Sequence, residues 1–318
     1  MQTLSFPETG ERFQVTEVMQ RSNDIMVMKV INKNKTEFLC KAFNKTKLEQ
    51  TNSYDNFVKR LTIIKQLNHP NIPRVISIQE FGNYIFIFFE AIHFVTAQEY
   101  LCSNGNMTPE EILSILTQLL SVIKFTHNLG LYHGFITLDN IMFDKDMVPQ
   151  LANFHLGANI NQTAFESISE YVNYTTPEEL KGSSVDYFAT DIWRLGVCVY
   201  TLLTGSFPFS DTNRAKLCQS IMKNEPDFKN IPPTISGRIR LMLMKDPKER
   251  PSASQLLSQN IDHRIVSVGL KQATTTAGHL LRSIQSQYKI SEITKATTVN
   301  FRHCMHPTYC DLPKIEPK

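Results

Sequence analysis

Short runs of β-branched and aromatic residues, separated by polar turns, occupy much of the first ninety positions of the chain. We predict that these runs are strands, because they are short, apolar and bounded by turn-forming residues. One segment between the third and fourth runs, 54–67, is predicted to be a helix. The region therefore favours a small antiparallel sheet with one helix. The predicted strands lie at 13–18, 25–31, 37–43, 76–79 and 84–89.

A helical spacing replaces this pattern from residue 108 onward. Thr108, Pro109 and Glu111 are residue types that start a helix: a capping threonine, a proline in the first turn and a glutamate three residues after the cap. Apolar residues then recur every three or four positions as far as Ile123, which predicts a helix with one buried stripe. A second capping box, at 252–255, predicts another helix start. The second part of the chain is therefore expected to be mainly helical.

Composition and charge exclude several classes of protein. A chain of 318 residues with 42% hydrophobic content can bury a large core, and it suits one two-lobed domain or two smaller ones. The formal net charge of +3 is small for this length, so we expect no nucleic-acid partner and no membrane partner. The longest apolar run, 84–95, contains Glu90 and is too short to span a bilayer, and 1–17 lacks the apolar core of a secretion signal. We therefore expect an intracellular protein, cytoplasmic or nuclear.

The six cysteines are scattered along the chain, which indicates reduced thiols and no disulfide framework. An amphipathic helix is predicted at 279–290. After it, His303, Cys304, His306 and Cys310 are residue types that bind zinc. Zinc sites usually draw their ligands from two separated pairs, so we expect no metal site. The prolines of the same segment are alternatively typical of an extended peptide that binds in another protein's groove.

A polar loop follows the predicted helix that begins near Thr108. It contains His133 and Asn140, and a second loop, 150–155, follows it. This spacing resembles the catalytic and metal-binding loops of eukaryotic protein kinases, in which His-Arg-Asp is followed by an asparagine five residues later and then by Asp-Phe-Gly. The resemblance implies an α+β, bilobal protein-kinase-like fold. It has a small antiparallel β-sheet lobe with a helix called helix C, and a larger, mainly α-helical lobe.

The resemblance also implies the domain boundaries. It covers residues 11–260. Within that range it implies a small lobe at 11–90, a hinge at 90–95 and a large lobe at 96–260. Residues 261–318 then form a C-terminal extension.

At the positions where this family carries out phosphotransfer, the chain has other residue types. Phe135 stands where an aspartate accepts the proton of the substrate hydroxyl, and a phenyl ring has no lone pair for a proton. Gly134 replaces an arginine that would bind a phosphate, and Thr137 replaces a lysine that steadies the transferring phosphoryl group. Asn153 replaces the aspartate that holds Mg²⁺, and an uncharged amide is a poorer ligand for that ion. No catalytic position is therefore intact.

The resemblance places five residues along the nucleotide cleft. Lys41 corresponds to the lysine of the third strand, Glu90 and Ile92 to the hinge, and Asn140 and Asn153 to the two polar loops. Two of them have a purely structural alternative. Lys41 is alternatively a solvated lysine on a strand face, and Asn140 an amide that bonds its own loop.

Two further substitutions affect this cleft. The segment 19–24 corresponds to a glycine-rich loop, and side chains at its three glycine positions would keep the backbone away from phosphate. Arg60 stands where helix C has the glutamate that pairs with the lysine, so we expect two cations, Lys41 and Arg60, to face each other. Asp55 or Glu49 is the alternative partner for the lysine, after a shift of the helix.

The residues that hold the large lobe together in this family are present. The resemblance implies a buried ion pair between Glu178 and Arg250. It also implies hydrogen bonds to Asp191 from the backbone of the polar loop that contains His133. Each of the three is alternatively a surface charge or a helix cap. The groups that maintain the fold are thus retained while the groups that move phosphate are missing.

This contrast predicts a catalytically impaired kinase-like protein, a pseudokinase. We expect it to act as a scaffold or allosteric regulator in signalling, with protein partners bound through the large lobe and the C-terminal tail. The alternative is a divergent Ser/Thr protein kinase with weak ATP-dependent phosphotransfer through Lys41 and Asn140. A third hypothesis is a nucleotide sensor that binds ATP without metal. We expect no cofactor, or ATP bound with little or no Mg²⁺.

Overall fold

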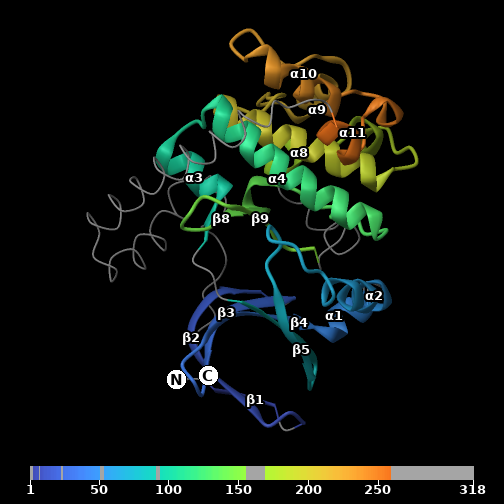
Figure 1. Ribbon diagram of the computed structural model, residues 1–318. Helices are drawn as coiled ribbons and strands as arrows, with labels where there is room; N and C mark the ends of the chain where they lie inside the picture. Colours follow the sequence, from blue (N-terminus) through green and yellow to red (C-terminus); the bar gives the residue numbers. More distant parts are fainter. Residues whose placement is uncertain are drawn as a thin grey trace.

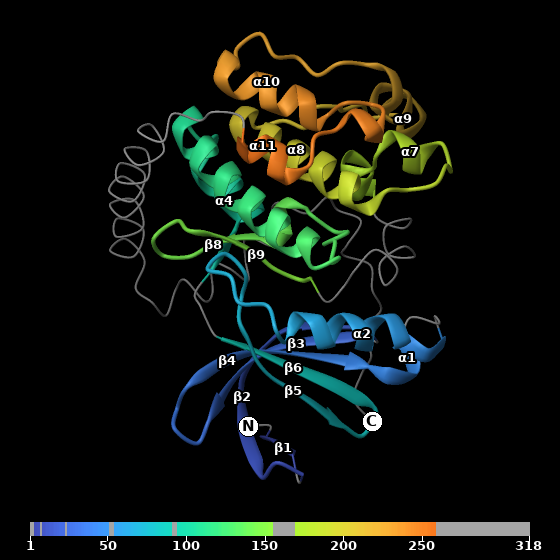
Figure 2. The ribbon, with the colours of Figure 1, turned by 45° about the vertical axis from the view of Figure 1, so that its right-hand side comes forward.

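The computed structural model describes residues 3–6, 8–22, 24–50, 54–90, 94–154 and 169–258. Two lobes are stacked one above the other, with the sheet in one and most of the helices in the other (Figures 1 and 2). The bilobal α+β fold expected from the sequence is therefore confirmed. The expectations for Ile92, for the helix at 279–290 and for the zinc-type donors at 303–310 lie outside the described residues.

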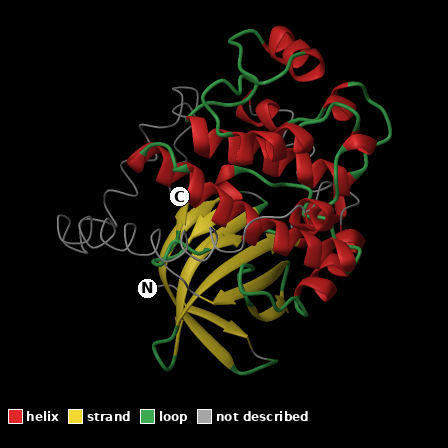
Figure 3. Ribbon diagram, turned by 45° about the horizontal axis from the view of Figure 1, so that its top comes forward, coloured by secondary structure: helices red, strands yellow, loops and turns green. Residues whose placement is uncertain are grey.

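The small lobe is built on an antiparallel six-stranded sheet (Figure 3), in the order β1-β2-β3-β4-β6-β5. Each predicted strand is present, and most of them run one to three residues longer than the apolar pattern indicated, because hairpin pairing continues into the polar flanks. The strands are β1 (Thr3–Phe6), β2 (Glu11–Arg21), β3 (Ile25–Asn32), β4 (Glu37–Asn44), β5 (Val75–Phe81) and β6 (Tyr84–Glu90).

The two faces of this sheet have separate hydrophobic cores, as the alternation of side chains along a strand requires. Phe86 and Phe88 belong to an outer cluster, whereas Ile85, Ile87 and Phe89 of the same strand belong to the main core that continues into the large lobe. The side chain of a residue therefore points outward or toward the large lobe according to its place in this alternation.

Strand β1 was not predicted, and it covers the outer cluster. It lies at the end of the sheet farthest from the large lobe (Figures 1 and 2). The ring of Phe6 lies 5.0 Å from that of Phe86 and 5.8 Å from that of Phe88, both edge to face. Aromatic pairs in this geometry contribute beyond the area that they bury. Four residues were too few for the sequence pattern to indicate a strand.

Helices α1 (Lys45–Gln50) and α2 (Tyr54–Ile64) lie between the sheet and the large lobe (Figure 2). The prediction extended the second helix to residue 67, and α2 ends three residues earlier. Phe57, Leu61 and Ile64 form its buried stripe, at the spacing of a helix face. α2 corresponds to the helix C of the resemblance.

The large lobe is organised around two long helices, α4 and α8, with α11 packed on α4 (Figure 1). Helix α4 begins with the predicted capping box: the Glu111 N–H donates to Thr108 Oγ1 at 3.3 Å, and the Thr108 N–H donates to the Glu111 carboxylate at 2.8 Å. The helices are α3 (Ala97–Asn104), α4 (Pro109–Asn128), α7 (Pro177–Leu180), α8 (Tyr187–Thr204), α9 (Arg214–Lys223), α10 (Pro233–Met242) and α11 (Ala253–Ser258).

Several short strands and 3₁₀ turns complete the large lobe. A second sheet, β7-β8-β9, lies on the side that faces the small lobe (Figure 2). No helix in the described part of the chain is both long enough and apolar enough to cross a bilayer. The remaining elements are β7 (Val95–Thr96), β8 (Ile141–Phe143), β9 (Pro149–Leu151) and the 3₁₀ turns η1 (Leu138–Asn140), η2 (Ser169–Tyr174) and η3 (Pro247–Glu249).

Candidate functional site

The central loop, 132–135, is held in place by hydrogen bonds to its backbone. The amide groups of His133 and Gly134 donate to the two carboxylate oxygens of Asp191, each at 2.7 Å. The Phe135 N–H donates to Nδ1 of His133 at 3.1 Å, and the Phe135 carbonyl accepts from Asn140 Nδ2 at 2.8 Å. The bonds expected between Asp191 and the central loop are thus confirmed.

His133 joins this loop to the next one. Its Nε2 lies 2.7 Å from the Ala152 carbonyl oxygen, and its ring lies 4.5 Å from that of Phe154. Burial lowers the pKa of His133 to about 4, so the ring is neutral near pH 7. Because Nδ1 accepts from Phe135, the single ring proton lies on Nε2 and is donated to Ala152. His133 therefore packs against Phe154 and connects the two loops.

The resemblance places Phe135 at the position of the catalytic base. Its side chain is only 9% exposed, and its ring lies 5.3 Å from the ring of Tyr171 in η2. The side chain has no atom that accepts a proton, and an aromatic residue of the following segment packs against it. A general base must come within hydrogen-bond reach of the proton that it removes, and this side chain cannot do so.

A chain of hydrogen bonds links the polar residues of the cleft. Lys41 Nζ donates to Asn153 Oδ1, and Asn153 Nδ2 donates to Asn140 Oδ1 at 2.5 Å. Asn140 in turn donates to Phe135, as described above. Both amide oxygens thus accept a hydrogen bond, and these are the atoms that would otherwise bind a cation. Asn140 therefore acts as the loop-bonding amide that the sequence left as an alternative.

Asn153 has the backbone conformation that this arrangement needs. Its φ is +73°, in the left-handed region, which asparagine tolerates better than most residues other than glycine. The conformation directs its side chain toward Lys41 and Asn140 together.

Lys41 is buried, with 8% of its surface exposed. Its Nζ lies 5.5 Å from the centre of the Phe89 ring, and burial lowers the pKa of the amine to about 8. Among the residues that the structure describes, no carboxylate forms an ion pair with it. Asp55 and Glu49, the alternative partners, are both exposed. The reading of Lys41 as a solvated lysine is therefore wrong.

Arg60 does not face Lys41, so the expectation of two opposed cations is wrong. Its Nε and Nη2 donate to the Phe154 carbonyl at 3.1 and 2.7 Å, and Nη2 also donates to the Tyr132 carbonyl at 2.8 Å. The guanidinium carbon lies 5.1 Å from the centre of the Tyr132 ring. Carbonyl dipoles and an aromatic face therefore compensate the charge of Arg60. Sequence reasoning missed this role because the partners are backbone atoms.

Gly134 is paired with an arginine from another helix. Its φ of +74° is in the left-handed region that glycine adopts readily. Its carbonyl accepts from Nη1 of Arg194 in α8, and Nη2 of Arg194 pairs with Glu179 at 2.8 Å. Arg194 Nε also donates to the Tyr174 carbonyl at 3.4 Å. Arg194, whose role the sequence pattern did not indicate, thus ties Gly134 to α8 and to Glu179.

The other predicted positions lie farther from this network or offer little chemistry. Thr137 is fully buried, and its hydroxyl has no hydrogen-bond partner among the described residues. Being neutral, it cannot neutralise a phosphate. Glu90 is exposed at the end of β6, where its N–H donates to the Arg74 carbonyl at 3.1 Å. Met19 is exposed on β2, which continues to Arg21 before a tight turn.

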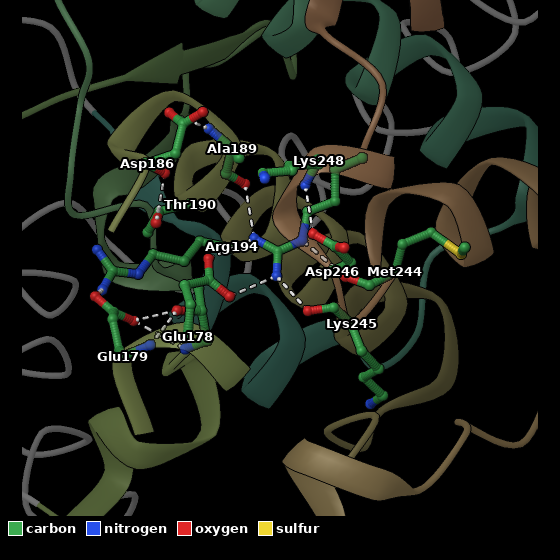
Figure 4. Close-up of polar contacts among 12 residues, drawn as sticks. Glu178, Glu179, Asp186, Ala189, Thr190, Arg194, Met244, Lys245, Asp246 and Lys248 are labelled. Atoms are coloured by element: carbon green, nitrogen blue, oxygen red, sulfur yellow. Dashed lines mark hydrogen bonds and ion pairs between the residues drawn. The ribbon is translucent and has the colours of Figure 1, made fainter. Parts of the chain in front are cut away.

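A second polar network lies deeper in the large lobe (Figure 4). Arg250 forms a two-pronged ion pair with Glu178, in which both N···O distances are 2.7 Å. Its Nε donates to the Met244 carbonyl at 2.8 Å, and its guanidinium lies 4.9 Å from the centre of the Trp193 ring. The predicted buried ion pair is therefore confirmed, and its surface alternative is wrong.

The chemistry of the cleft is that of cations and amides. In the described ranges, no group of three or more His, Cys, Asp or Glu side chains is placed to hold a metal ion. The oxygens available as metal ligands are the amide oxygens of Asn153 and Asn140, and each already accepts a hydrogen bond. Mg²⁺ prefers carboxylate ligands. Among the residues of this hydrogen-bond chain, Lys41 alone carries a formal charge, and that charge is positive. An anionic group therefore fits the site better than Mg²⁺ does.

Known proteins resemble this chain over most of its length. Among curated relatives, serine/threonine-protein kinase SIK1 of Mus musculus is 29% identical over 228 residues, 70% of this chain and 29% of the relative. SIK2 of Gallus gallus is 29% identical over 70% of this chain and 28% of the relative. The putative serine/threonine-protein kinase YPL150W of Saccharomyces cerevisiae is 29% identical over 205 residues, 64% of this chain and 23% of the relative. The chain thus spans less than a third of the length of these relatives.

A solved structure and a family model point the same way. The crystal structure of Rad53 1-466 in complex with AMP-PNP superposes with a TM-score of 0.66 at 23% identity, over 80% of this chain and 65% of that chain. At this identity the likeness concerns the fold. The family model described as protein kinase domain matches residues 13–261. The match covers well over half of the chain, and this chain therefore belongs to the protein kinase family.

Proposed function

We propose that this member of the protein kinase family is a pseudokinase, which acts as a scaffold or allosteric regulator and transfers little or no phosphate. One observation carries the proposal: Phe135, buried and packed against Tyr171, stands at the position of the proton acceptor. The closed chain of bonds from Lys41 through Asn153 to Asn140 supports it, because the groups that would hold a metal–nucleotide complex bind one another.

The expected loss of rate is large. A positioned general base contributes on the order of 10²–10⁴ in rate, and most of the catalysis of phosphoryl transfer comes from electrostatic stabilisation by metal ions and cations. In this chain the base, the metal carboxylate and the phosphate-binding lysine are replaced together, by Phe135, Asn153 and Thr137. Such losses are not additive because the residues act as a unit, yet any one of them suffices for a severe defect.

The alternative is a divergent Ser/Thr protein kinase with weak ATP-dependent phosphotransfer. It is favoured by the placement of Lys41 on the side of the sheet that faces the large lobe, where its ammonium donates a hydrogen bond to Asn153 in the loop after β9. The kinase names of the curated relatives are consistent with it. ATP would then bind with little Mg²⁺, because the cleft retains the lysine and lacks the carboxylate.

A thermal-shift titration with ATP, with and without Mg²⁺ or Mn²⁺, combined with radiolabel transfer to a generic peptide, separates the two functions. The pseudokinase predicts no transfer above a no-enzyme control, and either no thermal shift or one that is independent of metal. A strong Mg²⁺-dependent shift, with transfer that disappears in Lys41→Ala and persists in the exposed control Lys33→Ala, would overturn the proposal in favour of the kinase.

We further propose that protein partners bind through the large lobe and residues 261–318, inside the cell. The proposal is supported by the retained large-lobe frame around Glu178, Arg250 and Asp191. Cross-linking mass spectrometry of the full chain in cells is expected to give intermolecular links concentrated in 96–318. Links confined to the small lobe would contradict it.

A further inference from the structure

Arg60 ties the small lobe to two separate loops of the large lobe. It lies on α2, and its guanidinium donates to the carbonyls of Tyr132 and Phe154 at 2.8 and 2.7 Å. A weaker contact reaches the carbonyl of His133 at 3.4 Å. A planar guanidinium can bond several acceptors at once, which a lysine ammonium does less well. One side chain thus fixes a helix of the small lobe against both loops of the cleft.

The loop that receives these bonds is itself held on every side. From the carbonyl of Tyr132 to the carbonyl of Phe135, each backbone N–H and C=O group has a hydrogen-bond partner. The partners come from α2, α8, η1 and the loop itself. Asp191 and Arg194 of the buried helix α8 thus anchor the loop to which Arg60 binds.

The hydrogen bonds of Arg60 do not involve the residues expected to contact nucleotide. In the family that this chain resembles, helix C is tied to the sheet through the lysine that contacts nucleotide, which corresponds to Lys41 on β4. In this structure that lysine, Lys41, bonds Asn153, while α2 is tied through Arg60 to backbone carbonyls. None of the acceptor atoms belongs to a group that a nucleotide or a metal ion would bind.

We propose that Arg60 is a built-in clasp that holds α2 against the central loop without any ligand, so that the arrangement of the two lobes does not respond to nucleotide or Mg²⁺. The inference concerns the conformation of the chain and goes beyond its proposed lack of phosphotransfer. The bonds of Arg60 would hold α2 in one position, whereas the corresponding helix of an active relative would move.

Hydrogen–deuterium exchange of the full chain tests the clasp. Arg60→Met removes the donors and keeps much of the side-chain volume, and Lys59→Met, on the exposed neighbouring position of α2, is the matched control. We expect exchange of the α2 amides to rise by about 10- to 100-fold in Arg60→Met, since hydrogen bonds to charged groups change local opening equilibria by about such factors. Exchange in α4 and α8 is expected to stay unchanged, as it is throughout Lys59→Met.

Several results would overturn the proposal. One is exchange of α2 in Arg60→Met that equals that of Lys59→Met. Another is exchange that rises equally in α2, α4 and α8, because Arg60 would then contribute to global stability only. If Arg60→Met does not fold, Arg60→Lys decides, since it keeps the charge and loses the planar fork. The clasp predicts faster α2 exchange in Arg60→Lys, and wild-type exchange would contradict it.

A nucleotide arm separates the clasp from the proposed function. Addition of ATP, with or without Mg²⁺, to the wild-type chain is expected to leave α2 exchange unchanged, and Lys41→Ala is expected to leave it within about threefold of wild type, because loss of one remote hydrogen bond has a small effect. Increased protection of α2 on adding ATP would overturn the clasp even if no phosphate is transferred. Detected transfer with unchanged α2 exchange would overturn the pseudokinase alone.

Discussion

A buried arginine of the large lobe is paired with a carboxylate, whereas no carboxylate among the described residues pairs with the buried lysine of the cleft. Arg250 is paired with Glu178 at two distances of 2.7 Å. Lys41, equally buried, has an amide oxygen and a phenyl ring around its ammonium. The same chain thus retains complementary charge where it maintains the fold and lacks it where phosphotransfer would take place.

The difference has a simple physical basis. Removing one partner of a buried ion pair leaves an uncompensated charge, so both partners must be kept for the lobe to stay folded. A cleft that holds Mg²⁺ and phosphates needs carboxylates for the metal, and these destabilise the fold unless a cation is bound. Once phosphotransfer is not required, amides such as Asn153 and Asn140 satisfy one another and Lys41 at lower cost.

The largest effect is expected when the frame is broken. Arg250→Met leaves Glu178 buried without its partner, and we expect a loss of about 3–5 kcal/mol in the free energy of unfolding. Urea denaturation followed by circular dichroism measures it. Lys248→Met, on the same loop but exposed, is the control and should change stability by less than about 0.5 kcal/mol. Equal stability of the two variants would mean that the ion pair does not hold the lobe.

The free energy of unfolding is expected to depend on pH through His133, which connects the two loops of the cleft. Burial lowers the pKa of His133 to about 4 from 6.5, so the folded chain keeps this ring neutral while the unfolded chain protonates it. The contribution of the neutral His133 ring to the free energy of unfolding is fully present above pH 6.5. About 3 kcal/mol of this free energy is lost as the pH falls toward 4.

Urea denaturation of wild type and His133→Gln across this range isolates the effect, because the other titrating groups are common to both. We expect the wild-type chain to lose more stability than the variant between pH 6.5 and 4. Parallel curves would show that His133 is not the titrating group.

A smaller effect of opposite sign is expected in the cleft. Burial lowers the pKa of Lys41 to about 8, so its charge destabilises the fold at pH 7. Lys41→Met should raise stability by about 1–2 kcal/mol, the desolvation gain less the lost bond to Asn153. The gain should shrink as the pH rises from 8 toward 10.5, where the wild-type chain sheds the charge on folding. Chemical denaturation beside the exposed Lys33→Met tests it, and a destabilised Lys41→Met would mean that Lys41 has an unseen counter-charge.

The smallest effect is expected from restoring one catalytic group. Phe135→Asp supplies the missing carboxylate, yet Asn153 and Thr137 still lack the charges that position metal and phosphate. We expect radiolabel transfer to stay at background, as in the uncharged control Phe135→Asn. Transfer above that of the control would show that the cleft is closer to a working kinase than its hydrogen-bond network suggests.

The sequence by itself determined the two-lobed architecture and the frame. Alternation along the strands and the helical stripe from Ile112 to Ile123 are local patterns, so they predict elements without knowledge of the fold. The pairing of Glu178 with Arg250 followed from spacing shared with a known family. Phe135 was equally readable, because the absence of a proton acceptor is a property of the residue alone.

Only the tertiary structure decided how the cleft compensates for what it lacks. Arg60 and Arg194 bond backbone carbonyls 20 to 94 positions away in the chain. Every residue has a carbonyl, so no residue type in the sequence marks the partner. Strand β1 is too short to be predicted and exists because Phe6 finds the aromatic cluster of β6. Contacts of this kind depend on the folded path of the chain, and side-chain types alone do not encode them locally.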